Sequence, residues 1–520
     1  MSMQERSSVS ESTKEQQVRY EDILKQETEQ ARQGAPPPSS KVVSIKDLKR
    51  SQEKAEKDLA NWPTPAKSAE PDDGADSELE KHEADASRAE RKALMQELNN
   101  RHAVIENYGG KCVIACWEPS PTDPSRPTLV FQSVDAFRQR YANRFVKPLR
   151  ANQRPKALGT FWFSDPGRRQ YRGVTFEPAG PLVVNDYLNT WKGWGVEPKE
   201  GDWSGLQQHI KGVIADNDEQ AYEYIIRWIA WAIQHPDRQA EVALVLIGEK
   251  GTGKGTLIRC LEIIFGAHTF QVSSQEHVVG NFNAHHRDCI LFIADEAYWA
   301  GDKRCLGALQ RMITETKLSV EPKGYDLMEV PNRLHVIMLA EPGWVVPAGR
   351  YERRYAAFNV SDKRRGDHAY FKALHGEIKN GGAAAMMYDL QRTDLGDWHP
   401  REVYRTGALT EQTRHSLSPI EEWFEQLLQD GVLPHALTGR PETVISTHLY
   451  DDARKRFPYL RTHVSETKFG RFLRDKGCEN YSTGAARGWI FPPLAKARRD
   501  WEKAYLDWTW SKVSEWAASG

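Results

Sequence analysis

Residues 248–256 read Gly248-Glu249-Lys250-Gly251-Thr252-Gly253-Lys254-Gly255-Thr256, and they join an unbroken apolar run, 242–247, to an apolar-periodic segment, 257–265. An apolar strand, a glycine-rich turn and a helix in this order are the setting in which a phosphate-binding loop is credible. The glycines let successive backbone N–H groups turn toward an anion, and the start of the following helix adds unpaired N–H groups. We therefore predict that all nine residues cradle phosphates; the alternative is a glycine-rich surface turn.

Two side chains of this stretch have specific expected roles. Lys254 is placed to reach the outer phosphates of a nucleotide. The usual pattern has Ser or Thr directly after the lysine, but here Gly255 stands there and Thr256 follows one place later. We predict that the Thr256 hydroxyl contacts Mg²⁺.

Composition sets wide limits. The chain has 520 residues, a formal net charge of -1, 39% hydrophobic and 28% charged residues, which suits two or three globular domains. Binding to nucleic acid must then come from a local basic face. No apolar run approaches the roughly 20 residues that span a bilayer, and the first residues have no hydrophobic signal core. Six cysteines in a chain of this length do not form a disulfide scaffold. We expect a cytoplasmic protein without a membrane partner.

The apolar runs divide the chain into five parts. Runs at 242–247, 289–294 and 334–339 alternate with helical patterns, which predicts an α/β domain with a parallel sheet flanked by helices. Before it we expect a small α+β domain, with a helix at 89–99 and strand-like segments at 103–106, 111–117, 128–132 and 160–163, and then a helical region from 186 to 237. The expected parts are a disordered tail (1–85), the α+β domain (86–180), the helical region (181–238), the α/β domain (239–400) and a C-terminal module (418–510).

A second chemical signal follows the apolar run 290–294. Two adjacent carboxylates, Asp295 and Glu296, come at its end. Beside a phosphate loop, Asp295 can hold Mg²⁺ through its water shell and Glu296 can polarise an attacking water. The alternative is a helix N-terminus that favours acidic residues.

With these residues in place, the sequence resembles the superfamily 3 helicases of the AAA+ class, in the branch found in phage and prophage primase–helicases. The resemblance covers about 161–358. It rests on 248–256, in the GKGT form, on 292–296, on 312–323 with Val320-Glu321-Pro322-Lys323, and on 345–348 with Glu352-Arg353-Arg354-Tyr355.

The resemblance implies an AAA+-like P-loop ATPase core that uses ATP and Mg²⁺ in a homo-oligomeric, hexameric ring within a bacterial host cell. It implies that Arg354, or its neighbour Arg353, reaches into the ATP of the adjacent subunit. The implied catalytic residues are Glu296, Arg354, Arg353 and Lys254. One position departs from the family: Glu341 stands where a polar Asn is usual, and its charge near the γ-phosphate is expected to cause repulsion unless a cation intervenes.

Two places are candidates for contact with DNA. Lys323 and Tyr325 are expected at a hairpin tip that lines the ring's channel, where a lysine follows phosphates and an aromatic ring stacks on bases. In the C-terminal module, a capped helix at 464–477 carries Lys468, Arg471 and Arg474, and a short β-ribbon follows with Arg487 near its tip. Helix followed by ribbon predicts a winged-helix-like module; the alternative is a charged outer face without a ligand.

The leading hypothesis is an ATP-dependent DNA helicase or single-stranded DNA translocase that acts in replication of a phage or mobile element. No clear pair of strand-borne carboxylates precedes residue 161, so we predict a motor without primer synthesis. Two alternatives stay open: a nucleotide-dependent DNA-binding initiator or regulator with weak hydrolysis, and a small-molecule phosphotransferase.

Overall fold

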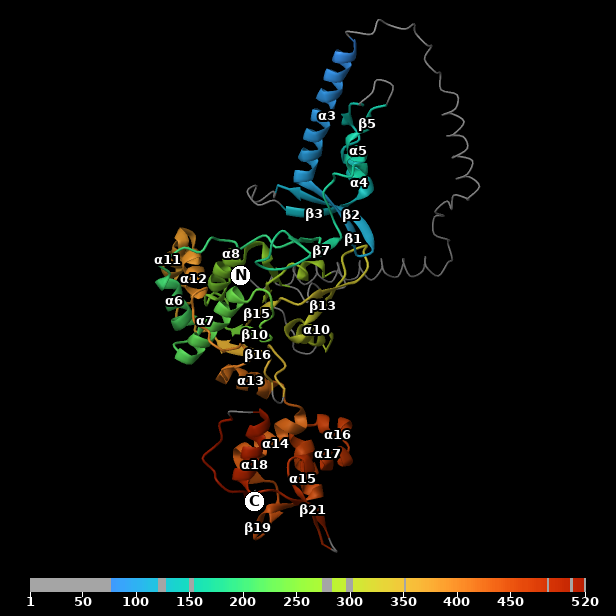
Figure 1. Cartoon of the computed structure of the whole chain (residues 1–520). Helices are drawn as coiled ribbons and strands as arrows, with labels where there is room; N and C mark the ends of the chain where they lie inside the picture. Colours follow the sequence, from blue (N-terminus) through green and yellow to red (C-terminus); the bar gives the residue numbers. More distant parts are fainter. Residues whose placement is uncertain are drawn as a thin grey trace, which may run out of the picture. The chain divides into compact units, whose positions relative to one another are not determined.

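A computed structural model of the chain describes residues 76–119, 128–148, 154–273, 283–295, 303–349, 352–483, 486–505 and 508–518 (Figure 1). Residues 1–75 of the expected disordered tail lie outside this set. Helix α3 (Asp76–Arg101) begins well before Ala89, where the sequence predicted its start. Its first half is rich in Glu, Lys, Ala and Arg, which favour helix without any apolar face. None of the described helices is long and apolar enough to cross a membrane.

The predicted parallel sheet is confirmed, and it has five strands. Every neighbouring pair runs parallel, so the carboxyl ends of all five strands meet at one edge. The spatial order is β11 (Thr269–Val272), β12 (Leu291–Asp295), β15 (His335–Ala340), β10 (Ala243–Ile247) and β16 (Tyr355–Asn359).

Helices cover both faces of this sheet, because its strands are apolar on both sides. Along β10, Leu244 and Leu246 pack into one core with residues of several helices, whereas Val245 and Ile247 face a second core on the other side. The first face is covered by α7 (Glu219–Gln234), α8 (Lys254–Phe265) and α12 (Ala383–Leu390), and the second by α10 (Lys303–Thr314) and α13 (Gly407–His415) (Figure 1). The result is a three-layer α/β domain.

The helical region predicted from Asp186 starts later than expected. Short strands β8 (Val183–Val184) and β9 (Tyr187–Asn189) lie beside β7 (Gly173–Thr175), and helix begins only with α6 (Ser204–His209) and the π-helical turn η1 (Ile210–Ile214). Between β9 and α6, contacts with another part of the chain hold the backbone in place. The Gly195 N–H donates to the Ile264 carbonyl at 2.7 Å, and a Cβ on Gly195 would lie 1.9 Å from the Ile263 oxygen. Contact with the end of α8 therefore overrides helix formation.

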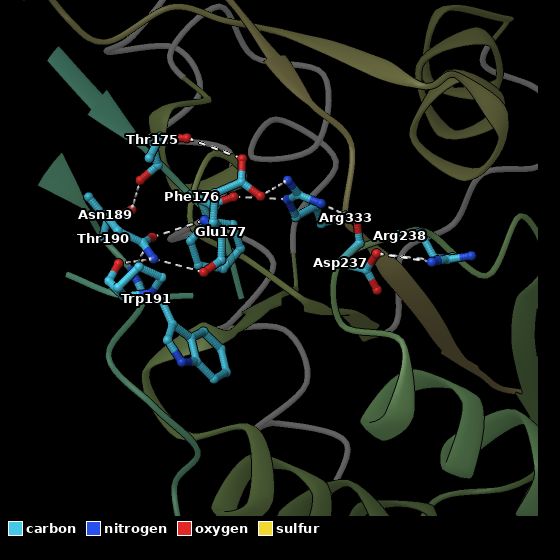
Figure 2. Close-up of polar contacts among 10 residues, drawn as sticks. Thr175, Phe176, Glu177, Asn189, Thr190, Trp191, Asp237, Arg238 and Arg333 are labelled. Atoms are coloured by element: carbon cyan, nitrogen blue, oxygen red, sulfur yellow. Dashed lines mark hydrogen bonds and ion pairs between the residues drawn. The ribbon is translucent and has the colours of Figure 1, made fainter. Parts of the chain in front are cut away.

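A mostly buried arginine, Arg333, connects the segment after β7 to the central sheet. The Arg333 guanidinium, just before β15, contacts the Glu177 carboxylate at 2.6 Å and donates to the Phe176 carbonyl at 2.9 Å and to the Asp237 carbonyl (Figure 2). The Asn189 side chain closes the loop by accepting from the Glu177 N–H and donating to its carbonyl (Figure 2). This charged network joins the end of α7, the segment after β7 and the start of β15.

The N-terminal α+β domain forms a four-stranded sheet with helices on one face. The segment Thr160–Phe163, predicted as a strand, is instead part of helix α5. Its aromatic residues favour strands, but Trp162 is buried against Phe137 and its indole N–H donates to Asn99 at 2.8 Å. The elements are β1 (His102–Tyr108), β2 (Lys111–Glu118), β3 (Thr128–Ser133), α4 (Val134–Arg140), β4 (Phe145–Val146), β5 (Lys156–Ala157), α5 (Leu158–Ser164) and β6 (Gln170–Tyr171), in the sheet order β3-β2-β1-β6.

The C-terminal module has its own core, built around Trp423, Phe424 and Trp501. The predicted basic helix is confirmed as α17 (Glu466–Asp475), with Ser465 accepting from the Lys468 N–H at its start. The predicted ribbon is β20 (Glu479–Ser482) with β21 (Arg487–Ile490). The other elements are α14 (Pro419–Asp430), β17 (Val432–Leu433), β18 (Ala436–Leu437), β19 (Arg440–Ile445), α15 (Ser446–Arg456), α16 (Tyr459–His463), α18 (Leu494–Tyr505) and β22 (Ala517–Ala518).

Candidate functional site

The glycine-rich stretch connects β10 to α8 at the carboxyl edge of the sheet. Two of its glycines have backbone conformations that L side chains rarely adopt, with φ of 78° at Gly251 and 107° at Gly253. At Gly253 the surroundings also forbid a side chain: a Cβ would lie 2.5 Å from the His209 ring and 2.9 Å from the Phe371 ring. The loop is therefore packed closely between the sheet and the two helices that carry His209 and Phe371.

The Lys254 side chain folds back over the glycine-rich turn. Its Nζ donates to the Gly248 carbonyl and, at 3.0 Å, to the Glu249 carbonyl. The buried Thr252 hydroxyl donates to the same Glu249 carbonyl at 2.9 Å. An arriving anion would compete with these carbonyls for the ammonium group, so Lys254 is poised at the place where phosphates would lie.

A cavity of about 470 Å³ opens over the loop. This volume falls within the roughly 300–1,000 Å³ of small-molecule sites. Among the predicted phosphate-binding residues, Lys250 to Thr256 line it, whereas Gly248 and Glu249 are not part of the lining. Its lining is Lys250, Gly251, Thr252, Gly253, Lys254, Gly255, Thr256, Arg259, Asp295, Leu339, Ala340, Glu341, Phe371 and His375.

The cavity brings Asp295 to the same space as Lys254, although 41 residues separate them in the chain. Asp295 ends β12, and its Oδ2 accepts a hydrogen bond from the Gln271 side chain at 2.9 Å. Gln271 lies on the neighbouring strand β11, so it holds one carboxylate oxygen in place. No motif or spacing in the sequence pointed to Gln271. Glu296, the predicted catalytic base, lies outside the described residues.

The Glu341 carboxylate forms an exposed ion pair with a cation from the loop itself, which screens its charge in part. Lys250 Nζ lies 3.3 Å from Glu341 Oε1, and both side chains line the cavity. Glu341 follows β15, the strand between β12 and β10. The structure thus supplies the cation that the sequence required, and it comes from the phosphate loop.

The two candidate finger arginines differ in their surroundings. The Arg354 guanidinium contacts both carboxylate oxygens of Glu352, at 2.9 and 2.8 Å, and the Glu352 side chain is only 4% exposed. The neighbouring Arg353 is exposed, and the structure gives its guanidinium no partner among the described residues. Arg353 is therefore the one able to reach a second molecule.

Both arginines lie far from the cavity of their own chain. They precede β16, and the start of β16 is paired with the start of β10, whereas the phosphate loop follows the end of β10. The amino edge and the carboxyl edge of the sheet are therefore the length of five strand residues apart, or about 16 Å at 3.3 Å per residue. Neither guanidinium is placed to serve the site in its own chain.

A buried histidine, His209, contacts the phosphate loop and supports it. His209 on α6 contacts the Gly253 carbonyl through Nε2 at 3.1 Å and the Tyr370 hydroxyl through Nδ1 at 3.0 Å. Burial lowers the pKa of His209, so the neutral form dominates at neutral pH. Because a carbonyl only accepts, Nε2 carries the proton and Nδ1 accepts from Tyr370. No local pattern in the sequence marked this residue.

The predicted hairpin exists, but its tip is partly taken up within the chain. β13 (Lys317–Val320) and β14 (Met328–Pro331) pair antiparallel, and Lys323 is exposed between them. The ring of Tyr325, expected to stack on bases, instead packs on Tyr108 with 5.0 Å between centroids. Lys111 donates to the Gly324 carbonyl at 2.7 Å. The tip is docked on the β1–β2 turn, which leaves Lys323 as its accessible cation.

The four basic residues predicted for the C-terminal module are all exposed. Lys468, Arg471 and Arg474 lie on α17, and Arg487 begins β21 of the ribbon. Phe469 and Leu473 of the same helix are buried in the module's core, so the basic residues face outward. No group of three or more His, Cys, Asp or Glu residues that could hold a metal was found in the described part of the chain.

Comparison with known proteins places the fold and leaves the activity open. A model of a family of unknown function (DUF5906) matches residues 246–354, which span the phosphate loop and both finger candidates. A search of curated proteins found no significant match.

Solved structures of the NrS-1 C-terminal region, without ligand, have a similar fold. Three of them superpose with TM-scores of 0.54, 0.56 and 0.57 at 15%, 14% and 15% identity. They cover 74%, 75% and 76% of this chain and 94%, 96% and 98% of theirs. At this identity the likeness concerns the fold, and it extends well beyond the α/β domain.

Proposed function

We propose that this chain is an ATP-dependent DNA helicase or single-stranded DNA translocase that hydrolyses ATP at the subunit interfaces of a ring. The observation that carries the proposal is the cavity in which the phosphate loop, Lys254 and Asp295 meet. A backbone cradle with an ammonium group and a strand-end carboxylate is the equipment that binds a triphosphate with Mg²⁺. Asp295 and Thr256 would hold the metal, which would neutralise charge on the transferred phosphoryl group.

The second support is the distance of the finger arginines from their own cavity. An exposed guanidinium at the opposite edge of the sheet has no use in its own site, but it suits the site of a neighbouring copy. A charge that develops on the phosphoryl group would then be stabilised from outside the subunit. The site is complete only in an assembly, which favours a ring motor over a monomeric phosphotransferase.

The proposed role in replication of a phage or mobile element rests on the sequence resemblance to superfamily 3 helicases. Contact with DNA would come from Lys323 at the hairpin tip and from the basic face of α17. Lysines and arginines on exposed elements follow a phosphate backbone without reading its sequence. Since Tyr325 packs on Tyr108, stacking on bases would require the tip to leave the β1–β2 turn.

The deciding experiment measures phosphate release from Mg-ATP by the full chain, alone, with single-stranded DNA and with free nucleosides. We expect single-stranded DNA to increase the rate several-fold and nucleosides to leave it unchanged. Formation of nucleoside monophosphates would show a phosphotransferase. Binding of ATP without phosphate release under any condition would favour the second candidate, a nucleotide-dependent DNA-binding initiator.

Glu341 is the observation that favours this second candidate, since it places negative charge near the terminal phosphate. Glu341→Gln should raise ATP affinity by about two- to fivefold, the size expected for one partly exposed charge. Titration of wild-type and variant protein with Mg-ATP would measure the change. Glu200→Gln, an exposed site outside the cavity lining, serves as the control. Weaker binding in Glu341→Gln would mean that the carboxylate's hold on Lys250 matters more than its charge.

A further inference from the structure

The part of the cavity that the phosphate chemistry leaves unused is formed by helix α11 (His368–Glu377). Phe371 and His375 both line the cavity, and their spacing of four residues puts them on one face of the helix. The start of α11 is fixed by Asp367, which accepts from the Tyr370 N–H at 3.1 Å. Phe371 is half-buried, and its ring makes T-shaped contacts with His209 at 6.0 Å and with Tyr370 at 5.2 Å between centroids. The same ring forms part of the cavity wall.

The sheet order places this aromatic wall opposite the carboxylates. Asp295 and Glu341 follow β12 and β15, which lie on one side of β10. Helix α11 follows β16, which lies on the other side. The phosphate loop, at the end of β10, is between them. A phosphate chain whose metal-binding end faces Asp295 must therefore direct the rest of the molecule toward Phe371 and His375.

We infer that Phe371 and His375 form a base-binding subsite, so that the ligand is a nucleoside triphosphate held by stacking of its base on the Phe371 ring. This inference rests on the proposed function. A flat, apolar ring surface suits a nucleobase, because base–aromatic stacking works with any base. The exposed His375 imidazole can exchange a hydrogen bond with the base edge or the ribose. An inorganic polyphosphate has no flat ring that could stack on Phe371.

Phe371 also touches the loop, so its role in stacking must be separated from a role in support. A Cβ at Gly253 would lie 2.9 Å from the Phe371 ring, which shows how closely the ring approaches the phosphate cradle. If the ring only supported the loop, its loss would weaken binding of every phosphate ligand alike. If it stacks on the base, its loss would weaken nucleotide binding and spare inorganic triphosphate.

The test compares Mg-ATP with Mg-tripolyphosphate by calorimetric titration of the wild type, Phe371→Leu and Phe371→Trp. Leucine keeps apolar packing but cannot stack, and tryptophan restores a stacking surface. We expect Phe371→Leu to weaken ATP binding by about 5- to 100-fold, the range for loss of one base–aromatic stack, with tripolyphosphate binding unchanged. Phe371→Trp should bind ATP as the wild type does. Phe145→Leu, an exposed position outside the cavity lining, should change neither.

Each other outcome overturns a stated part of the account. Equal loss of ATP and tripolyphosphate binding in Phe371→Leu would make the ring a support for the loop. Unchanged ATP binding in this variant would remove the subsite and leave the proposed function standing. A wild-type protein that binds tripolyphosphate but gains nothing from the nucleoside would also refute the subsite. A wild-type protein that binds neither ligand would refute the proposed function and this inference together.

Discussion

Lys254→Ala should lower ATP turnover by about 10²- to 10³-fold, the loss expected when one preorganised donor is removed from the reacting charge. Lys254 is the ammonium group in the loop, and it shares the cavity with Asp295. Phosphate release with single-stranded DNA present measures the effect. The fold should persist, because the Gly248 and Glu249 carbonyls that accept from Lys254 lie within the same loop. Thermal unfolding monitored by circular dichroism checks this.

The matched control is Lys199→Ala, which removes an exposed ammonium group outside the cavity lining. Its turnover should equal that of the wild type. Under the initiator alternative, Lys254→Ala would bind DNA normally and the wild type itself would release little phosphate. If Lys254→Ala retains wild-type turnover, the phosphate-loop account of this site is wrong.

Arg353→Ala should lower turnover by about 10³-fold or more, since an arginine finger contributes roughly 10³–10⁵ to the rate of phosphoryl transfer. ATP affinity should change little, because the guanidinium acts on charge that develops during the reaction. Arg354→Ala is the informative neighbour. It removes the partner of the buried Glu352 carboxylate, so the expected effect is a lower unfolding temperature.

A mixing experiment tests whether the finger acts between subunits. Lys254→Ala subunits keep Arg353, and Arg353→Ala subunits keep the phosphate loop. In a mixed ring, some interfaces combine an intact loop with an intact finger. If two inactive variants mix at random in equal amounts, about a quarter of the interfaces in the ring are complete. Recovery of activity on mixing is the expected result. No recovery, with subunit exchange shown independently, would contradict action in trans.

Much of the α/β domain could be predicted from local patterns. The apolar runs at 242–247, 289–294 and 334–339 are long enough and bounded well enough to identify three strands of the sheet, and all three are confirmed. The predictions failed where a distant contact overrode local preference. Thr160–Phe163 has the aromatic content of a strand, but burial of Trp162 against Phe137 fixed it as a helix.

The sequence predicted only part of the candidate site, because residues distant in the chain complete it. The sequence pointed to the loop and to Asp295, but it marked neither Gln271, which holds Asp295, nor His209, which holds the loop. These residues come from β11 and α6, and only the packing of the domain brings them to the loop and the strand end. A single residue at such a position leaves no periodic or spacing signal.

By itself the sequence determined the glycine-rich turn, the strand and the helix that flank it and the acidic strand end, because each depends on conformational limits and apolar patterns within a few residues. The tertiary structure decided the order of the strands and therefore the layout of the cavity, with carboxylates on one side of the loop and Phe371 and His375 on the other. It also decided that Lys250 pairs with Glu341. This pairing joins the phosphate loop to the end of another strand, where small differences in backbone direction select one partner among several of equal charge.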